Sequence, residues 1–205
     1  MKTERWNSLD VDLAAERLKH GAVVAFPTDT VYGLGVCYDQ EKALTALKQA
    51  KGRPEKKPIP LMIANLSQAR QVADVSDRAW RIMEKWMPGA LTVVLRKRPE
   101  VPAYVTNGLD TIALRMPDDN FVRILIEKCG KPLLVSSANR SGETTGRTGE
   151  AVLEQLDGAI DAIVMGTAKG TLASTIVDCS TADLRVLREG PINEQTLRKL
   201  WDENR

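Results

Sequence analysis

The sequence contains few of the residues on which several common kinds of active site depend. It has one histidine, His20, so a Ser-His-Asp triad is possible only if that residue takes part. Its three cysteines, Cys37, Cys129 and Cys179, lie far apart and are odd in number, which fits neither a disulfide framework nor the ligand spacing of a zinc site. This cysteine usage is typical of a reducing compartment, and we expect a cytoplasmic protein.

Strong charge of one sign and long apolar runs are also missing. The formal net charge is +2, so no global field draws the chain onto nucleic acid or a membrane, although a local basic patch is allowed. The apolar runs have the length of strands, far below the roughly 20 residues that span a bilayer. The first residues, Met-Lys-Thr-Glu-Arg-Trp, lack the apolar segment of a signal peptide. We therefore expect no signal peptide and no membrane partner.

Two common nucleotide-binding motifs are absent from the sequence. No Gly-x-x-x-x-Gly-Lys-Ser/Thr segment is present, which excludes a P-loop enzyme. No Gly-x-Gly-x-x-Gly segment follows a strand, which excludes the usual dinucleotide-binding motif. Asp29 could hold Mg²⁺, but a single carboxylate in a loop more often makes a local turn bond, and we predict no metal site formed by the protein alone.

The order of the predicted elements indicates an α/β protein. A chain of 205 residues, 43% of them hydrophobic, predicts one domain over residues 1–205. Strands and helices alternate over most of the chain, while some late strands lack a helix between them, so we expect a single twisted mixed sheet flanked by helices. The helices are expected at 9–20, 41–50, 77–86, 119–128, 149–156 and from 194, and the strands at 23–26, 59–63, 91–96, 111–115, 133–135, 160–165, 174–178 and 184–187. The expected helix caps are Ser8, Asp39, Ser67, Ser76, Asp118 or Asp119, Thr148 and Asn193.

A polar, glycine-containing loop is expected after the first core strand. Residues 23–26 form a β-branched and aromatic run, and Pro27 ends the strand because it has no N–H to donate. Thr28, Asp29 and Thr30 follow, and Gly33 and Gly35 are expected to keep this segment in a loop that a ligand can approach closely. Ligands of open α/β sheets bind just past the carboxyl ends of strands. The alternative is a strand followed by an ordinary turn.

Cations and hydroxyl groups recur at the predicted ends of strands and helices. Several cations that converge on one cleft would bind a polyanion, and arginine pairs well with phosphate or carboxylate. The alternative is ordinary solvated surface charge, which we accept for Lys56. The cations are Lys51, Arg53, Lys57, Arg115, Arg147 and Arg188, and the hydroxyl residues are Thr30, Thr111, Ser137, Thr145 and Ser174.

Six ordered blocks of sequence resemble one protein family. Residues 26–35 read Phe-Pro-Thr-Asp-Thr-Val-Tyr-Gly-Leu-Gly, and residues 51–54 read Lys-Gly-Arg-Pro. Further blocks are Trp-Met-Pro-Gly-Ala-Leu-Thr at 86–92, Asp-Thr-Ile-Ala-Leu-Arg-Met-Pro at 110–117, Ser-Ala-Asn-Arg-Ser-Gly at 137–142, and Ser-Thr-Ile-Val-Asp at 174–178 with Leu-Arg-Glu-Gly at 187–190. Together they resemble the TsaC/YrdC family, the threonylcarbamoyl-AMP synthases, from about residue 21 to residue 201. The chain resembles the single-domain form of that family.

The resemblance implies a fold, a reaction and partners. The family folds as one twisted α/β sheet around a basic cavity. It converts L-threonine, bicarbonate and ATP, with Mg²⁺, into threonylcarbamoyl-AMP and pyrophosphate. The product serves partner proteins that form N6-threonylcarbamoyladenosine in tRNAs reading ANN codons. Direct contact with tRNA is left open by the sequence.

The resemblance also implies roles for individual residues. It implies that four residues bind the substrate threonine, with Arg115 binding its carboxylate, and that six residues bind ATP. Four residues form the expected catalytic group near the triphosphate. The threonine residues are Thr30, Arg115, Val135 and Ser174; the ATP residues are Arg53, Lys57, Thr111, Ser137, Thr145 and Arg188; the catalytic residues are Lys51, Arg53, Ser137 and Asn139.

Some positions depart from the family pattern. Met62 stands where many members have His, and Glu189 replaces a frequent Pro. Leu172 and Ala173 precede Ser174 where many members have Glu, or Pro and Ser. These departures leave open a paralogue of the superfamily that binds RNA or a nucleotide without this synthase activity. From their composition, residues 51–58 and 142–148 are the candidates for loops that close over ATP.

Overall fold

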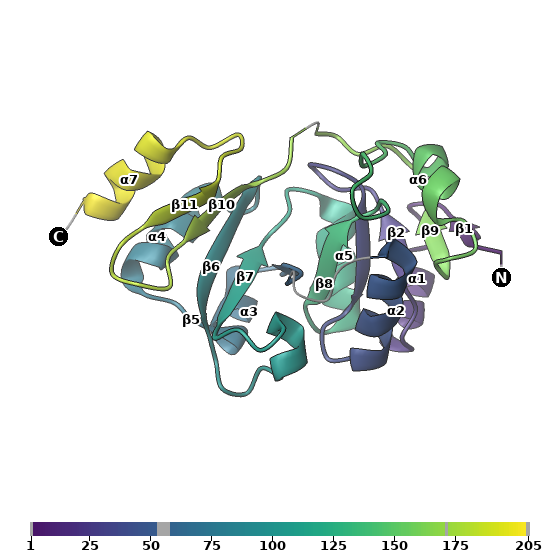
Figure 1. Ribbon diagram of the computed structural model, residues 1–205, viewed down its shortest axis with the longest axis horizontal. Coiled ribbons are helices and arrows are strands. Elements are labelled where there is room, and N and C mark those ends of the chain that lie inside the picture. Colours follow the sequence, from purple (N-terminus) through teal and green to yellow (C-terminus); the bar gives the residue numbers. More distant parts are fainter. Residues whose placement is uncertain (1, 53–57, 171, 204–205) are drawn as a thin grey trace.

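One mixed sheet organises the protein. The computed structural model describes residues 2–52, 58–170 and 172–203. Its strands join in the order β1-β9-β2-β3-β8-β4-β7-β6-β10-β11, and the short β5 pairs with β6 (Figure 1). The strands are β1 (Glu4–Trp6), β2 (Val24–Phe26), β3 (Gly33–Cys37), β4 (Leu61–Met62), β5 (Ala73–Asp74), β6 (Leu91–Lys97), β7 (Thr111–Arg115), β8 (Leu133–Ser137), β9 (Ala162–Val164), β10 (Thr175–Asp178) and β11 (Arg185–Arg188).

The sheet contains both parallel and antiparallel pairs, as predicted. Strand β9 runs parallel to β1 and β2, and β10 runs parallel to β6. In the middle, β3 is antiparallel to both β2 and β8, and β6 is antiparallel to β7. The α/β class and the mixed sheet are therefore confirmed, while the assignment of residues 1–205 to one domain stays a prediction.

Helices cover the sheet on two faces and create two cores. Adjacent residues of β2 point to opposite faces, so Ala25 packs into a core with α2, while Val24 and Phe26 pack into another with α1 and α5. Helices α4 and α7 lie together beside β10 and β11, away from α1, α2 and α5 (Figure 1). The helices are α1 (Val11–Lys19), α2 (Glu41–Lys51), α3 (Leu66–Val72), α4 (Asp77–Trp86), α5 (Asn120–Cys129), α6 (Gly149–Leu156) and α7 (Glu194–Asp202), with a 3₁₀ turn, η1, at Ala103–Thr106.

Four of the predicted helix caps are confirmed. The side chains of Ser76, Asp119, Thr148 and Asn193 each accept a hydrogen bond from a backbone N–H in the first turn of the helix that follows. Each bond satisfies one of the amide groups that a helix start leaves without an intrahelical partner. These four helices begin where the sequence predicts.

Three other predicted caps are wrong. Helix α1 begins after Asp10 rather than Ser8, and the Asp10 carboxylate accepts from the backbone N–H of Asn7, which precedes the helix. Asp39 pairs with Lys131 instead of capping α2. Asn65, and not the predicted Ser67, caps α3. The side-chain oxygen of Asn65 also accepts a hydrogen bond from the Ser67 hydroxyl.

The two glycines of the first motif lie in a strand and not in a loop, which corrects the sequence prediction. Gly33 and Gly35 belong to β3, which is wholly buried, and neither has a positive φ. A Cβ built on Gly35 would lie 2.8 Å from Cε1 of Phe26, and one on Gly33 would lie 2.8 Å from Cγ1 of Val135. Glycine is required here because the side chains of Phe26 and Val135 occupy the space that a Cβ would need.

Replacing Gly35 by alanine is expected to destabilise the fold by about 1–3 kcal/mol, since the added methyl group overpacks a closed core. The shortened variant Phe26→Leu opens space at the same place. In denaturant unfolding, the double variant should therefore lose less stability than the two single changes added together. Strictly additive losses would show that the ring and the strand do not compete for this space.

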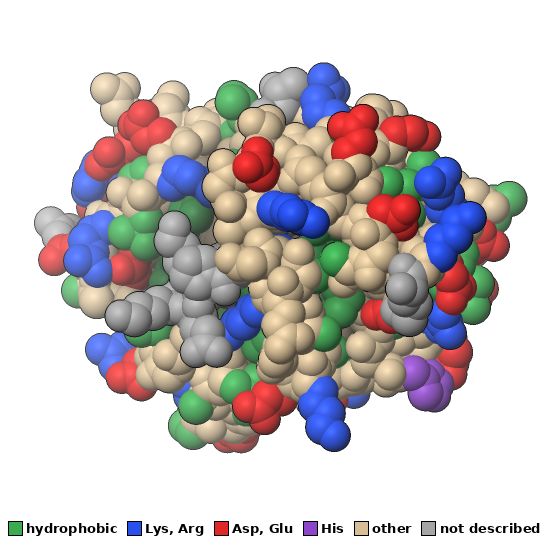
Figure 2. All heavy atoms as spheres, turned by 45° about the vertical axis from the view of Figure 1, so that its right-hand side comes forward, with side chains coloured by type: hydrophobic (Ala, Val, Ile, Leu, Met, Phe, Trp, Pro, Cys, Tyr) green, Lys and Arg blue, Asp and Glu red, His purple; other side chains and the backbone are tan. Residues whose placement is uncertain are grey.

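The remaining differences concern short elements. The expected strand at 59–63 is reduced to β4 in the middle of the sheet, and β1 and β5 are too short to give a clear periodic pattern in the sequence. The short helix expected after Ser67 is present as α3. Among the described residues, no helix combines the length and the apolar character needed to cross a bilayer. On the face shown in Figure 2, basic and acidic side chains alternate, in keeping with the net charge of +2.

Candidate active site

A cavity of about 430 Å³ opens where several polar segments meet. It is bounded by the turn between β2 and β3, the end of β8 with the loop after it, the end of β7, and β10 with β11. Eight of the residues singled out in the sequence line it: Thr30, Arg115, Val135, Ser137, Asn139, Thr145, Ser174 and Arg188. Segments up to about 160 positions apart in the chain thus contribute to one site.

Arg115 is a fixed cation on the wall of this cavity. It ends β7, and its Nη2 donates to Oδ1 of Asp29 at 2.7 Å, its Nη1 to Oγ1 of Thr30 at 2.7 Å, and its Nε to the carbonyl of Gly89 at 3.2 Å. The side chains of Arg115 and Asp29 are only 7% and 10% exposed. Burial lowers the pKa of Arg115, and the Asp29 carboxylate opposes that shift.

Asp29 therefore does not act as the sequence suggests. Among the contacts described, its side chain makes an ion pair with a residue 86 positions away in place of the expected local turn bond. A buried ion pair fixes geometry well when further hydrogen bonds satisfy both partners. Here the pair orients the guanidinium next to the Thr30 hydroxyl, ready to receive a carboxylate.

A second polar group surrounds Ser174, next to Arg115 in the sheet, because the β6–β7 register sets Thr92 beside Arg115. The hydroxyl of Thr92 lies 2.7 Å from the Ser174 hydroxyl, and both residues are buried. Nη2 of Arg188 donates to the carbonyl of Ser174 at 2.8 Å and to its hydroxyl at 3.2 Å. Burial lowers the pKa of Arg188. This group can bind the hydroxyl or the anionic part of a small ligand.

Thr92 is a lining residue that the sequence analysis did not single out. It belongs to the Trp-Met-Pro-Gly-Ala-Leu-Thr block, but its role depends on strand pairing that the block does not reveal. The parallel register of β6 and β10 sets Thr92 opposite Ile176 and so next to Ser174. A hydroxyl between apolar residues at the start of a buried strand was the available signal, because such groups need a partner.

Lys51 supports the cavity from behind and does not line it. This residue ends α2 and is only 2% exposed. Its Nζ donates to the carbonyls of Ser137 and Asn139, and its own carbonyl accepts from the N–H of Ser141 at 2.8 Å. In this structure Lys51 thus holds the loop after β8, and its predicted place near a triphosphate stays a prediction.

The loop after β8 is held by its own side chains as well. Nδ2 of Asn139 donates to the carbonyls of Arg140 and Glu143, at 2.7 and 2.8 Å. Oδ1 of Asn139 accepts from the hydroxyl of Thr145 at 3.1 Å. The loop therefore presents Ser137 and Thr145 to the cavity from a fixed backbone.

Other predicted residues are not brought to the cavity or cannot be placed. Thr111 is outside its lining: it begins β7, four residues before Arg115, which corresponds to about 14 Å along a strand. The predicted ATP contact of Thr111 is not supported by this position, because the cavity lies at the other end of the strand. Arg147 donates to the carbonyl of Ala168. Arg53 and Lys57 fall outside the described residues.

The described lining offers little with which the protein alone could hold a metal. Glu143 is its one carboxylate residue, and no group of three or more His, Cys, Asp or Glu side chains suitable for a metal ion occurs among the described residues. Mg²⁺ is usually bound by one or two carboxylates together with substrate phosphates. The donor set fits a magnesium ion that arrives bound to phosphate.

Comparisons with known proteins agree on one family. A family model described as telomere recombination, which joins the names Sua5, YciO and YrdC, matches residues 16–190. The threonylcarbamoyl-AMP synthase of Bacillus subtilis is 37% identical, with 96% of this chain and 61% of that protein covered. The synthase of the same name from Pyrococcus abyssi is 35% identical, with 98% and 60% covered. This chain thus spans about three-fifths of the length of these two relatives.

This chain is also similar to a relative of about its own length and to two solved structures. The threonylcarbamoyl-AMP synthase of Vibrio cholerae is 34% identical, with 86% of this chain and 95% of that protein covered. The structure of P. abyssi Sua5 complexed with L-threonine superposes with a TM-score of 0.91 at 32% identity, covering 98% of this chain and 61% of that one. Escherichia coli YciO superposes with a TM-score of 0.83 at 26% identity, covering 94% and 96%.

Proposed function

Because this chain belongs to the Sua5/YciO/YrdC family, we propose that it is a threonylcarbamoyl-AMP synthase that converts L-threonine, bicarbonate and ATP into threonylcarbamoyl-AMP and pyrophosphate. The observation that carries the proposal is the convergence of Arg115, Ser174, Arg188 and the loop after β8 on one cavity. The three relatives bearing that name support it.

L-Threonine binds across Arg115 and the neighbouring Thr92–Ser174 pair. Its carboxylate pairs with the guanidinium of Arg115, which Asp29 and Thr30 hold in place. Its hydroxyl makes hydrogen bonds to the Thr92–Ser174 pair. Each hydroxyl of that pair can donate or accept, so the pair can bind the substrate hydroxyl in either role. A site built to bond a hydroxyl rejects analogues that lack it far better than an apolar pocket does. The P. abyssi Sua5 structure, which shares this fold, is a complex with L-threonine, and this supports threonine as the ligand.

ATP binds with its phosphates toward the loop after β8 and Arg188. Ser137 supplies a hydroxyl donor there, Thr145, whose proton goes to Oδ1 of Asn139, lines the cavity beside it, and Arg188 supplies charge. Arg53 and Lys57 remain predicted phosphate contacts. Mg²⁺ would be held mainly by the phosphates, with Glu143 as the available carboxylate, and when bound it neutralises charge on the triphosphate.

The chemistry suits a site rich in cations and poor in histidine. The free amine of threonine and bicarbonate give a carbamate and water. A carbamate oxygen then bonds to the α-phosphorus while the bond to pyrophosphate breaks, so the adenylate forms and pyrophosphate leaves. Since the carbamate is already an anion, this attack needs charge neutralisation more than a general base.

Release of pyrophosphate tests the proposal. Purified protein should release pyrophosphate from ATP only when L-threonine and bicarbonate are both present, each omission lowering the rate to background. Two results would contradict the proposal: pyrophosphate release that does not depend on L-threonine or on bicarbonate, and no release when all substrates and Mg²⁺ are present. Either would favour the alternative, a paralogue that binds a nucleotide or RNA without synthase activity.

Thr92→Val tests the hydroxyl-binding pair. Removing this partner of Ser174 is expected to raise the KM for L-threonine about tenfold, because a neutral hydrogen bond contributes about 0.5–1.5 kcal/mol. Preference for L-threonine over 2-aminobutyrate should fall as well. The control Thr45→Val removes an exposed hydroxyl that bonds to Glu41 within α2, and should leave both values unchanged. An unchanged preference in Thr92→Val would place the substrate hydroxyl elsewhere.

Use of the product lies beyond this chain. We propose that the adenylate is passed to proteins that form N6-threonylcarbamoyladenosine in tRNA, as the family resemblance implies. The cytoplasmic location and the contact with those proteins remain predictions.

A further inference from the structure

Two hydroxyl groups lie in contact in the turn between β2 and β3. They belong to Thr28 and Thr30, which are 1% and 3% exposed and line the active-site cavity. Their oxygens lie 3.2 Å apart. The hydroxyl of Thr30 also accepts a hydrogen bond from Nη1 of Arg115 at 2.7 Å. These contacts decide in which direction the Thr30 hydroxyl can bond to a ligand.

The proton of Thr28 is used within the turn. Its Oγ1 donates to the carbonyl of Val31 at 2.7 Å and accepts from the backbone N–H of Thr30 at 3.1 Å. A hydroxyl has one proton and two lone pairs, so Thr28 keeps a lone pair, and no proton, for the hydroxyl of Thr30. In the contact between the two hydroxyls, Thr30 is therefore the donor.

The Thr30 hydroxyl is left with one acceptor position. Its proton points to Thr28, and one of its two lone pairs receives the N–H of Arg115. The second lone pair can face the cavity. Thr30 can therefore bind a hydrogen-bond donor of the ligand, and it has no proton to give to a carboxylate.

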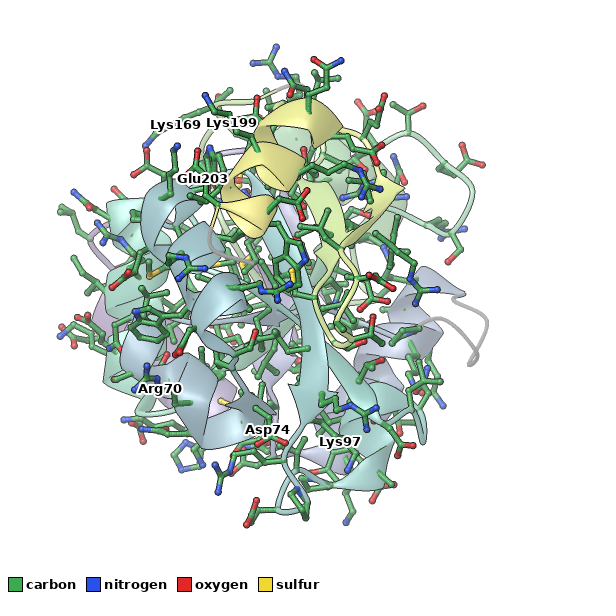
Figure 3. The ribbon with its side chains drawn as sticks, turned by 90° about the vertical axis from the view of Figure 1, so that its left-hand side faces the viewer. Arg70, Asp74, Lys97, Lys169, Lys199 and Glu203 are labelled. Atoms are coloured by element: carbon green, nitrogen blue, oxygen red, sulfur yellow. The ribbon has the colours of Figure 1, made fainter. Side chains whose placement is uncertain are left out.

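The backbone of this turn is held from outside by the segment after β9. The backbone N–H of Lys169, a residue labelled in the upper part of Figure 3, donates to the carbonyl of Thr28 at 3.1 Å. A Cβ built on Gly170 would lie 2.7 Å from the carbonyl oxygen of Asp29 and 2.8 Å from Cα of Thr30, so this segment packs directly on the turn. With the backbone held, rotation of the Thr30 hydroxyl is the freedom that Thr28 removes.

The amine is the substrate donor that fits this position. In the proposed function, on which this step rests, the Thr92–Ser174 pair binds the substrate hydroxyl and Arg115 binds the carboxylate. The amine and the carboxylate share one carbon, so a carboxylate on Arg115 brings the amine to the Thr30 hydroxyl bonded to the same guanidinium. We propose that Thr28 is a positioning residue that turns the Thr30 proton away from the cavity, so that Thr30 accepts a hydrogen bond from the amine of L-threonine.

This direction of the hydrogen bond suits the first chemical step. An amine that donates an N–H to Thr30 keeps its own electron pair free to attack bicarbonate, whereas a hydroxyl proton aimed at the nitrogen would occupy that pair. The carbamate that forms still carries one N–H. Thr30 can therefore hold the nitrogen before and after the step.

Three ligands separate the contacts that Thr30 could make. L-Threonine has all three polar groups, 2-aminobutyrate lacks the hydroxyl, and (R)-3-hydroxybutyrate lacks the amine. Binding of each to the full chain is measured by titration calorimetry. Thr30→Val should weaken binding of L-threonine and of 2-aminobutyrate about tenfold, because each loses a neutral hydrogen bond. Binding of (R)-3-hydroxybutyrate should stay nearly unchanged.

Variants of Thr28 test the positioning role against a matched control. Thr28→Val should lower kcat/KM for L-threonine about tenfold, while Thr28→Ser, which keeps the hydroxyl, should retain most of it. The control is Thr106→Val. Thr106 is 2% exposed and, like Thr28, donates to a carbonyl three residues further on, that of Leu109 at 2.7 Å, but it lies outside the described cavity lining. Its loss should lower stability and leave kcat/KM unchanged.

Three results would overturn the proposal. If Thr30→Val weakens L-threonine and (R)-3-hydroxybutyrate but not 2-aminobutyrate, Thr30 binds the substrate hydroxyl. If it weakens all three ligands equally, Thr30 binds the carboxylate. An equal loss of kcat/KM in Thr28→Val and Thr106→Val would leave Thr28 a structural role alone. Each of these results in a parent protein that releases pyrophosphate overturns this inference only, whereas an inactive parent contradicts the proposed function as well.

Discussion

Arg115→Met is expected to lower kcat/KM for L-threonine about 1,000-fold. The substitution removes the cation to which we assign the substrate carboxylate, and losing one partner of a buried charged pair costs about 2–5 kcal/mol. It also leaves Asp29 buried without its partner, so the free energy of unfolding should fall by about 3–5 kcal/mol. Steady-state kinetics and denaturant unfolding measure the two effects separately.

Two companion variants distinguish recognition from stability. Asp29→Asn combined with Arg115→Met removes the orphaned charge, so it should recover most of the lost stability while activity stays low. Arg115→Lys keeps the charge but not the forked contact with Asp29 and Thr30, and should retain only part of the activity. Recovery of full activity in the double variant would contradict the assigned role of Arg115.

Lys51→Met is expected to destabilise the protein by about 3 kcal/mol and to reduce turnover at least 100-fold. The carbonyls of Ser137 and Asn139 would each lose a charged donor, and an unsatisfied buried group costs about 1–3 kcal/mol. The loop after β8 would then no longer present Ser137 and Thr145 to ATP in one position. Unfolding curves and the KM for ATP report these effects.

Lys48→Met is the matched control for this change. Lys48 lies one turn earlier on α2, and its Nζ donates to Oδ1 of Asn107 at 2.8 Å, outside the cavity lining. Its loss should cost no more than about 1 kcal/mol and leave turnover unchanged. Similar effects of the two substitutions would show that α2 as a whole, and not the buried ammonium, supports the loop.

The fold class followed from sequence because its signals are local. The caps Ser76, Thr148 and Asn193 act within one turn, so the starts of these three helices were confirmed. Strand β3 was missed because its glycines are explained only by the Phe26 ring on the neighbouring strand. No local propensity records that contact.

The site was predictable from motifs but its internal contacts were not. Eight of the singled-out residues share the cavity, although their roles stay predictions. The pairing of Asp29 with Arg115, and of Thr92 with Ser174, joins positions more than 80 apart in the chain. Likewise, the position of Thr111 at the far end of β7 and the burial of Lys51 depend on strand register and packing, which residue types alone do not specify.

The central claim is that one cavity brings threonine, bicarbonate and ATP together. Mass spectrometry of a reaction with ¹³C-bicarbonate tests it most directly. The account predicts a threonylcarbamoyl adenylate that carries the label in its carbamoyl carbon and disappears in Arg115→Met. An unlabelled adenylate of threonine, or ATP broken down without any threonine-containing product, would contradict it.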